Sequence, residues 1–435
     1  MALGGGTFTT QNKKLPGTYI NFVSAANASA TLSDRGVATM AFELDWGEEN
    51  KVFEVTNGDF QKNSQKIFGY AYSSDKLKGL RDLFLYTKTL YAYRLNAGGV
   101  KASNDYATAK YSGIRGNDLI IRIQPNTEDK TAFVVDTLLD GDVVDEQTVH
   151  AASDLVANDY VTFKADATLT TGAGIPLAGG TNGDVSGNAH QSYLNAIESY
   201  TYNTMGVVAT DESTKTLYTS FVKRLRDEMG VKFQLVVYNK AADYMGTINV
   251  KNKVTDDGWS EASLVYWATG VSAGCEVNKT NQNKKYDGEF TIDTAYTQAQ
   301  LEKCIDAGEW TLHQVGDDVR VLEDINSMVT VSDTCGEVFK DNQTVRVIDQ
   351  IANDIAVLFN TKFMGTVPND AAGRTSLWSS IVQYHEQLLD IRAIESFSDS
   401  DVTVEQGTSK KSVVVTDAIT VVNAMDKLYM TVTVS

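Results

Sequence analysis

The sequence is poor in cysteine, histidine and proline, with three, four and four of them among 435 residues. Cys275, Cys304 and Cys335 are odd in number and lack C-x-x-C spacing, which favours reduced, mostly buried thiols over a disulfide framework or a zinc site. The histidines, at positions 150, 190, 313 and 385, stand far apart without the spacing of metal ligands. Each is therefore expected to be a surface or partly packed residue. The composition predicts no metal site and no cofactor.

Positive charge is also scarce, since 38 lysines and arginines face 56 acidic residues and leave a formal net charge of −18. A protein that coats nucleic acid needs a basic surface, so direct nucleic-acid binding is not expected. No apolar run approaches the length of a membrane helix, and "MALGGGTFTT" has neither the basic nor the apolar region of a signal peptide. We expect a soluble protein made in a cytoplasm, without membrane insertion.

Motifs for nucleotide chemistry are missing as well. There is no Walker loop, and "GAGIPLAGG" lacks the G-x-G-x-x-G spacing of a dinucleotide site. One motif does suggest an enzyme: "GVSAG", Gly270 to Gly274, matches the nucleophile elbow of α/β hydrolases. Ser272, however, lies late in "SEASLVYWATGVSAG", which has a helical pattern and a serine cap signal at Ser260. We interpret Ser272 as a structural serine on a helix and keep a Ser272 hydrolase as the alternative.

Mixed periodicity along the chain predicts a multidomain protein of mixed α/β and α+β class. "AHQSYLNAIESY" and "STKTLYTSFVKRLRDEMG" are typical of helices, the second ending at Gly230, and they alternate with the strands "MGVVAT" and "VKFQLVVY". Such alternation favours parallel strands covered by helices. "DLIIRIQP", "TAFVVDTLL", "DVVDEQTV" and "YVTFKAD" are short strands instead, two of them joined across Asp140-Gly141, a strong hairpin signal. They predict an inserted all-β domain.

Two long helices are expected near the C-terminus and should pack together. Gly365 and Pro368 separate them, and Asn369 or Asp370 can cap the second. Their apolar faces consist of Val345, Ile348, Ala352, Ile355 and Phe359 in the first and Leu377, Ile381, Tyr384, Leu388 and Ile391 in the second. The expected domains are an N-terminal arm (1–24), the first part of an α/β core (25–99), an inserted β-sandwich (100–178), the rest of the core (179–325), a C-terminal domain (326–423) and a C-terminal arm (424–435).

Both ends of the chain have the pattern of solitary strands. In "KLYMTVTVS", Leu428, Met430, Val432 and Val434 alternate with polar or aromatic residues, which is typical of a half-buried strand. Ile20 and Phe22 alternate similarly with their neighbours. A strand carries a row of N–H and C=O groups that need a partner. Either the chain folds back on itself, or the partner is another molecule.

Four stretches resemble contractile tail sheath proteins of phages, prophages and phage-tail-like bacteriocins, particularly those from Gram-positive hosts. They are "LPGTYINFVSA", "LAGGTNG", "NDIAVLFNTKFMGTVPND" and "VNAMDKLYMTVTV", in the same order and nearly end to end. The resemblance implies a non-catalytic subtilisin-like core layer, an inserted β-sandwich, and a C-terminal domain that faces the tail tube. It implies a structural subunit of a virion or tail-like particle, with itself as main partner in stacked hexameric rings of a helical sheath. The tail tube, baseplate and tail terminator proteins are the other partners it implies. Beside the Ser272 hydrolase, another kind of self-assembling structural protein is kept as an alternative.

The resemblance also implies that each subunit gives strands to its neighbours and receives strands from them by β-augmentation. The implied donors are Thr18, Tyr19, Ile20, Asn21, Phe22 and Val23 at one end, and Leu428, Tyr429, Met430, Thr431, Val432, Thr433 and Val434 at the other. The implied acceptor strands contain Val402 and Val404, and Val413, Val414 and Val415. Lysine pairs lie beside these strands, at Lys13 and Lys14 and at Lys410 and Lys411. They are either docking charges for the arms or ordinary solvated turns.

Overall fold

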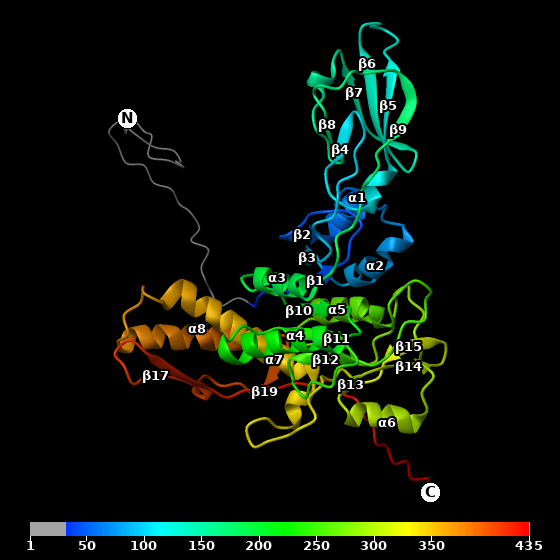
Figure 1. Ribbon diagram of the computed structural model, residues 1–435. Coiled ribbons are helices and arrows are strands. Elements are labelled where there is room, and N and C mark those ends of the chain that lie inside the picture. Colours follow the sequence, from blue (N-terminus) through cyan, green and yellow to red (C-terminus); the bar gives the residue numbers. More distant parts are fainter. Residues whose placement is uncertain (1–31, 435) are drawn as a thin grey trace, which may run out of the picture. The chain divides into compact units, whose positions relative to one another are not determined.

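A computed structural model describes residues 32–434; residues 1–31 and 435 are outside this description (Figure 1). The described chain divides into two units. The first contains residues 34–349 with 423–434, and the second contains residues 350–422 with 32 and 33. Each unit is described by itself below.

A seven-stranded sheet forms the centre of the first unit, in the order β13-β12-β11-β10-β1-β3-β2. All neighbouring strands run parallel except β2, which pairs antiparallel with β3. The strands are β1 (Val37–Phe42), β2 (Val52–Thr56), β3 (Thr89–Arg94), β10 (Thr204–Val207), β11 (Gln234–Tyr238), β12 (Thr247–Val250) and β13 (Glu309–Trp310). β10, β11 and β12 are buried at every residue, as strands covered on both faces should be.

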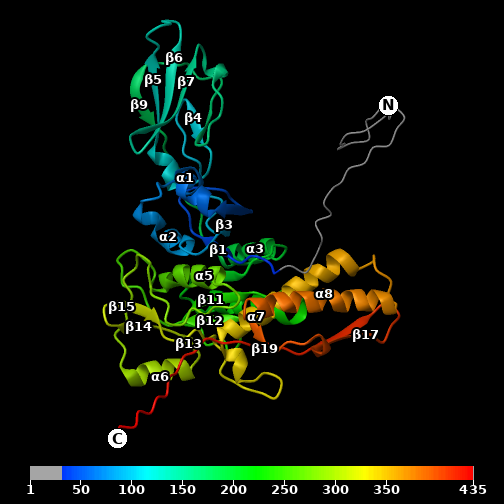
Figure 2. The ribbon, with the colours of Figure 1, turned by 180° about the vertical axis from the view of Figure 1, so that it is seen from behind.

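Helices cover both faces of this sheet (Figures 1 and 2). Side chains of α1 (Asn57–Phe68), α2 (Lys78–Phe84) and α5 (Leu264–Gly274) share one apolar cluster with the sheet. Those of α3 (Gly187–Ile197) and α4 (Glu212–Lys223) share another. After α4 a π-helical turn, Arg224–Glu228, leads to Gly230 at φ 77°, where glycine is favoured. The prediction of parallel strands between helices is confirmed.

An all-β region is inserted between β3 and α3. Its four-stranded antiparallel sheet has the order β7-β6-β5-β9, and β4 pairs with β8 beside it. The bounds are β4 (Ala107–Ala109), β5 (Leu119–Pro125), β6 (Phe133–Leu139), β7 (Asp142–Val149), β8 (Val161–Phe163) and β9 (Gly172–Pro176). Asp140 and Gly141 both have positive φ, 57° and 91°, which is the geometry of a type I′ turn between β6 and β7. The predicted hairpin is confirmed.

The glycine-rich segment "LAGGTNG" forms part of the neck that connects this β region to the sheet. Its backbone pairs with the other connecting segment, since Val100 and Thr181 exchange two hydrogen bonds of 3.1 and 3.0 Å. A Cβ atom on Gly183 would clash with the Ala97 carbonyl, and one on Gly99 would clash with the Thr181 carbonyl. Glycine is needed in the neck because two backbones approach each other there without room for side chains.

The first unit is completed by α6 (Gln298–Asp306) and the hairpin of β14 (Leu312–Val315) and β15 (Asp318–Val321). The second unit contains α8 (Ala371–Asp390), the pair β16 (Ile394–Glu395) and β19 (Thr420–Val421), and the hairpin of β17 (Val402–Gln406) and β18 (Val413–Asp417). α7 (Asn342–Leu358) belongs to both units, because the division falls at residue 349. Among the described helices, none has the length and apolar character needed to cross a membrane.

Both predicted C-terminal helices are present. Asp370 is the N-cap of α8, with its Oδ1 atom accepting from the Gly373 N–H at 2.8 Å. The helices contact each other within the second unit, where the buried Tyr384 hydroxyl donates to Asp354 of α7 at 2.8 Å. Cys275 and Cys304 are buried free thiols, and Cys335 is partly exposed.

The "GVSAG" motif is inside a helix, in agreement with the structural interpretation of Ser272. Ser272 is 3 % exposed on α5, and its hydroxyl has no hydrogen-bond partner among the described residues. The glycines have a packing role: a Cβ on Gly270 would clash with the Leu83 carbonyl at the end of α2, and one on Gly274 would clash with the Tyr86 carbonyl. The motif allows α5 to lie close to α2.

One expectation is wrong. His385, expected at the surface or partly packed, is completely buried on α8. It is stacked on Phe397 and makes an edge contact with Tyr384. Asp417, the carboxylate that pairs with His385, is 32 residues further along the chain, so no local sequence pattern could have revealed the burial.

We predict that Gly270→Ala destabilises the first unit by about 1–3 kcal/mol, because the added methyl must displace backbone of α2. Ser272→Ala is the matched control on the same helix and should change stability little, since its hydroxyl has no partner to lose. Urea unfolding followed by tryptophan fluorescence measures both. Equal midpoints for wild type and Gly270→Ala would contradict the packing role.

Candidate functional site

The last described residues form an extended segment that leads away from the folded part of the first unit (Figures 1 and 2). Within the described chain, residues 425–434 belong to no helix or strand and make no backbone hydrogen bond. Leu428 is 86 % exposed, Met430 74 % and Val432 69 %. Exposed large apolar side chains in a row mark an interaction surface, and unpaired peptide groups make this one suited to strand pairing.

The segment begins at a fixed point on the first unit. The Ala424 N–H donates to Gln343 Oε1 at 3.1 Å, and the Asn423 side-chain amide donates to the Thr344 hydroxyl at 3.1 Å. Both acceptors lie in the first turn of α7, and both are buried. The extended segment therefore starts where α7 starts.

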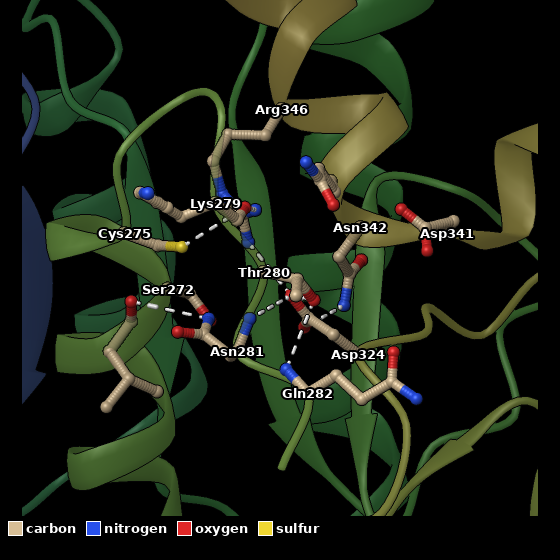
Figure 3. A network of polar contacts seen from close by, with 12 residues as sticks. Ser272, Cys275, Lys279, Thr280, Asn281, Gln282, Asp324, Asp341, Asn342 and Arg346 are labelled. Atoms are coloured by element: carbon tan, nitrogen blue, oxygen red, sulfur yellow. Dashed lines mark hydrogen bonds and ion pairs between the residues drawn. The ribbon is translucent and has the colours of Figure 1, made fainter. Parts of the chain in front are cut away.

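A buried carboxylate, Asp324, holds the beginning of α7 in place (Figure 3). It is 2 % exposed and interacts with five donors. They are the Thr280 hydroxyl (3.3 Å), the Asn281 N–H (2.8 Å), the Trp310 indole N–H (3.3 Å), the Asn342 amide (3.0 Å) and the Arg346 guanidinium (3.2 Å). Because five donors meet one carboxylate, its negative charge is stabilised in the interior of the unit.

Arg346 and Cys275 complete this network. Arg346 is 1 % exposed and donates through its other Nη atom to the Lys279 carbonyl at 2.7 Å. The Cys275 thiol points to the same carbonyl, and burial raises the pKa of the thiol. A thiol that stays protonated is a poor nucleophile, so Cys275 is a packing residue here.

A second buried ion pair fixes α7 two turns later. Arg226, on the π-helical turn after α4, places Nη2 2.8 Å from Oδ1 of Asp349 and donates to the Phe233 carbonyl at 2.6 Å. Arg226 is 2 % exposed. Residues 342–349 of α7 are thus tied to the central sheet region at both ends, and the root of the extended segment is rigid.

The β17–β18 hairpin of the second unit has strand edges without backbone partners. The Gly407 N–H donates to the Ser412 carbonyl and the Ala418 N–H to the Asp401 carbonyl, so the even-numbered residues of β18 face β17. Val413, Val415 and Asp417 turn their peptide groups outward. Within residues 32–434 these groups make no backbone hydrogen bond. On the outer side of β17, the Val402 carbonyl accepts from the Trp378 indole at 3.0 Å.

His385 connects α8 to the end of β18. Its Nδ1 atom lies 2.9 Å from the Ile381 carbonyl, and its Nε2 atom lies 2.9 Å from Oδ2 of Asp417. Both neighbours are acceptors, so a ring with a proton on each nitrogen suits this position. Burial disfavours the charged ring, but the Asp417 carboxylate and the Ile381 carbonyl outweigh it, and the pKa of His385 is raised. Tyr384 and Phe397, the aromatic neighbours, add no charge.

The other residues singled out in the sequence fall into two groups. Lys410 and Lys411 are exposed in the turn between β17 and β18. The N-terminal strand candidates from Thr18 to Val23, together with Lys13 and Lys14, lie outside the described residues. The sequence did not point to the network around Asp324 or to the Arg226–Asp349 pair, whose partners are 123 residues apart.

A cavity at the carboxyl ends of β1 and β10 is the place where α/β enzymes commonly bind substrates, and its polar lining includes His190, Asp211 and Ser260. Each of these side chains has a structural partner. His190 lies 3.0 Å from the Tyr218 hydroxyl, Asp211 caps α4, and Ser260 caps the turn before α5. Among the described residues, no group of three or more His, Cys, Asp or Glu side chains could hold a metal ion.

Comparison with family models finds four consecutive matches. Residues 35–95 match the tail sheath protein Gp18 domain III N-terminal region, and residues 97–182 match the phage tail sheath protein beta-sandwich domain. Residues 183–327 match the phage tail sheath protein central domain, and residues 334–435 match the phage tail sheath C-terminal domain.

Individual relatives agree with these matches. The chain is 32% identical to the phage-like element PBSX protein XkdK of Bacillus subtilis (strain 168), with 100% of each chain covered. The crystal structure of the sheath tail protein from Desulfitobacterium hafniense is 36% identical, with a TM-score of 0.82 over 95% of this chain and 99% of that one. The sheath of an extracellular contractile injection system in its contracted state shares the fold alone, at 12% identity and a TM-score of 0.59 over 98% of each chain.

We predict that Asp324→Asn destabilises the first unit by about 3–5 kcal/mol, because an amide would point N–H groups at donors and leave Arg346 as an unpaired buried charge. Guanidinium unfolding measures the loss. Asp333→Asn, at an exposed position of the loop before α7, is the matched control and should leave the unfolding midpoint unchanged. An unchanged midpoint for Asp324→Asn would show that the network does not hold α7.

The raised pKa of His385 predicts a pH dependence of opposite sign to that of a carboxylate. Since the folded pKa lies above the unfolded value of about 6.5, the ion pair stabilises fully below about pH 6.5. The stabilisation is lost as the pH rises through the folded pKa. NMR titration of the histidine ring carbons should give His385 a pKa above 6.5 in the wild type and a lower pKa in Asp417→Asn. A pKa that is the same in both proteins would rule out the ion pair.

Proposed function

Since the chain belongs to the phage tail sheath protein family, we propose that it is a structural subunit that polymerises around an inner tail tube by exchange of terminal strands. In this proposal the polymer contracts and drives the tube through a cell envelope. The observation that carries the proposal is the segment from Leu428 to Val434, which has the alternation of a strand, exposed apolar side chains and unpaired peptide groups.

The proposed acceptor is the β17–β18 hairpin of a neighbouring copy. Val402, Val404, Val413 and Val415 lie on one face of the hairpin, because the cross-strand partners 402 and 417, 404 and 415, and 406 and 413 share a face. An added strand would extend this apolar face with Leu428, Met430, Val432 and Val434. Val414 lies on the opposite face and is 52 % exposed, next to Thr403, Glu405 and Thr416.

The energy of one link is modest. Burying the four apolar side chains of the donated strand contributes about 1.5–3 kcal/mol each. Ordering each backbone residue costs about 1–2 kcal/mol, so a seven-residue strand gains little on balance. Many such strand links in one polymer hold the subunits together while the contacts between their cores rearrange. The energy for contraction then comes from better packing between cores in the second state, without a bound fuel.

The rigid root of the arm suits this mechanical role. Because Ala424 is tied to α7, and α7 is tied to the first unit by Asp324 and Asp349, a pull on the arm acts directly on the folded core. The corresponding N-terminal donor comprises Thr18 to Val23. Lys13 and Lys14 beside it, and Lys410 and Lys411 beside the acceptor, would guide docking onto the acidic surface of a neighbour.

The remaining assignments follow from the family. We assign residues 1–24 and 424–435 to arms, 25–99 and 179–325 to a subtilisin-like core without catalytic function, 100–178 to the inserted sandwich and 326–423 to the C-terminal domain. The partners are other copies in stacked hexameric rings, the tail tube, and the baseplate and terminator proteins at the two ends, with assembly in the cytoplasm of a bacterial host. A hydrolase built on Ser272 has no support, since the serine is buried inside α5.

We predict that deletion of residues 424–435 yields a folded monomer that forms no tubes, because the donated strand is missing. Size-exclusion chromatography and circular dichroism verify folding, and negative-stain electron microscopy records assembly. Ser272→Ala is the matched control and should form normal tubes. Normal tubes from the truncated chain would refute strand donation by the C-terminal arm.

A further inference from the structure

A groove of about 270 Å³ lies in the second unit beside the start of β18. Its apolar walls come from the π-helical turn that follows α7 (Phe359–Phe363), the segment before α8, the first turns of α8, and β18. The apolar lining residues are Phe359, Phe363, Met364, Val367, Pro368, Leu377 and Val413. Met364 is 58 % exposed although it is large and apolar, so the groove has an open apolar rim.

The charged side chains that line the groove are both positive. They are Arg374, from the first turn of α8, and Lys411, two residues before Val413. Within residues 32–434 neither forms an ion pair with an acidic side chain. In a chain with a net charge of −18, an apolar groove with a purely basic rim is unusual and fits an occupant that is apolar and acidic.

Val413 makes the groove continuous with the open edge of β18. It lines the groove and also begins the strand whose outer peptide groups, at Val413, Val415 and Asp417, have no backbone partner in the described chain. A strand that pairs with this edge must place one of its side chains at the mouth of the groove. The groove would then recognise a particular side chain of that strand, in addition to the backbone pairing.

We propose that the groove binds the stretch from Asp426 to Met430 of a second copy, with Leu428 inserted in the groove and Asp426 facing Arg374 and Lys411. This inference rests on the proposed strand exchange and adds to it a direction and a register. The donated strand runs parallel to β18, so that Leu428 lies beside Val413 and Met430 lies beside Val415.

The spacing of charged and apolar side chains supports the parallel register. Asp426 precedes Leu428 by two residues, and Lys411 precedes Val413 by two residues. A parallel strand with Leu428 beside Val413 therefore also has Asp426 beside Lys411. In an antiparallel arrangement with Val434 beside Val413, Leu428 falls beyond the end of β18 and Asp426 has no basic neighbour. The parallel register is therefore the one that satisfies both kinds of contact.

Lys427 does not cancel the charge of Asp426 in the bound strand. Successive side chains of a strand point to opposite faces, so Asp426, Leu428 and Met430 share one face and Lys427 lies on the other. In the unbound chain Lys427 lies 3.4 Å from Asp426 and 4.0 Å from Glu323; the Lys427 side chain is 62 % exposed, that of Asp426 42 % and that of Glu323 21 %. Exposed ion pairs contribute little, so docking can replace them at small cost.

The test uses the full-length chain at a concentration where it is monomeric, titrated with fluorescein-labelled peptides of residues 423–435. The wild-type peptide should bind, and the peptide with Leu428→Ala should bind about tenfold more weakly, as expected for loss of a buried aliphatic side chain. Lys411→Glu in the chain should weaken binding of the wild-type peptide about fivefold or more, as loss of a charge pair can. A peptide with Asp426→Lys should restore binding to that variant.

Arg392→Glu is the matched control, because Arg392 carries the same charge at an exposed position of the same unit but does not line the groove. It should leave the affinity within about twofold of the wild type. Two results would overturn the groove assignment and leave strand donation standing. One is a wild-type peptide that binds with no effect of Leu428→Ala, and the other is an equal loss of affinity for Arg392→Glu and Lys411→Glu without rescue. Absence of any peptide binding would overturn strand donation as well.

Discussion

Peptide groups in an extended chain have to be paired if the chain is to be buried, and this constraint explains the organisation of the protein. The seven-stranded sheet satisfies it internally, with helices on both faces. The segment after Ala424 and the outer edge of β18 do not satisfy it within the described chain. The segment after Ala424 has exposed peptide donors and acceptors on a sequence with the alternation of a strand. The outer edge of β18 has unpaired peptide donors and acceptors on a strand that is already formed. The two are complementary, which is why we interpret them as halves of one sheet made from two copies.

Buried ion pairs fix the helix from which the C-terminal arm starts. Asp324 gathers five donors, and Arg226 pairs with Asp349, so the first part of α7 is held by interactions that are costly to break singly. The arm starts at the same helix, through Ala424 and Gln343. A subunit built in this way can transmit a pull on its arm to its core, while the peptide groups of residues 425–434 have no backbone partner in the described chain.

Much of the fold could be predicted because it is local. Three features depend on residues that are close together in the sequence. They are the alternation of helix and strand from residue 187 to residue 238, the Asp140-Gly141 turn and the Asp370 cap. The helical position of Ser272 followed from its surroundings in the same way. His385 was misjudged because its burial depends on Asp417 and Phe397, and the Asp324 network was missed because its members come from residues 280–346. Long-range polar pairing has no periodicity, so the sequence alone carries no signal for it.

The candidate site was partly predictable for a similar reason. Alternation from Leu428 to Val434 predicted a strand, and the family resemblance implied the acceptor strands that form the β17–β18 hairpin. The basic groove could not be predicted, because it needs several elements brought together by folding. The most direct test of the account is a cryo-electron microscopy map of the assembled polymer. We expect residues 428–434 to be hydrogen-bonded along the β17–β18 hairpin of a neighbouring copy. A map in which this segment pairs only with strands of its own chain would contradict the account.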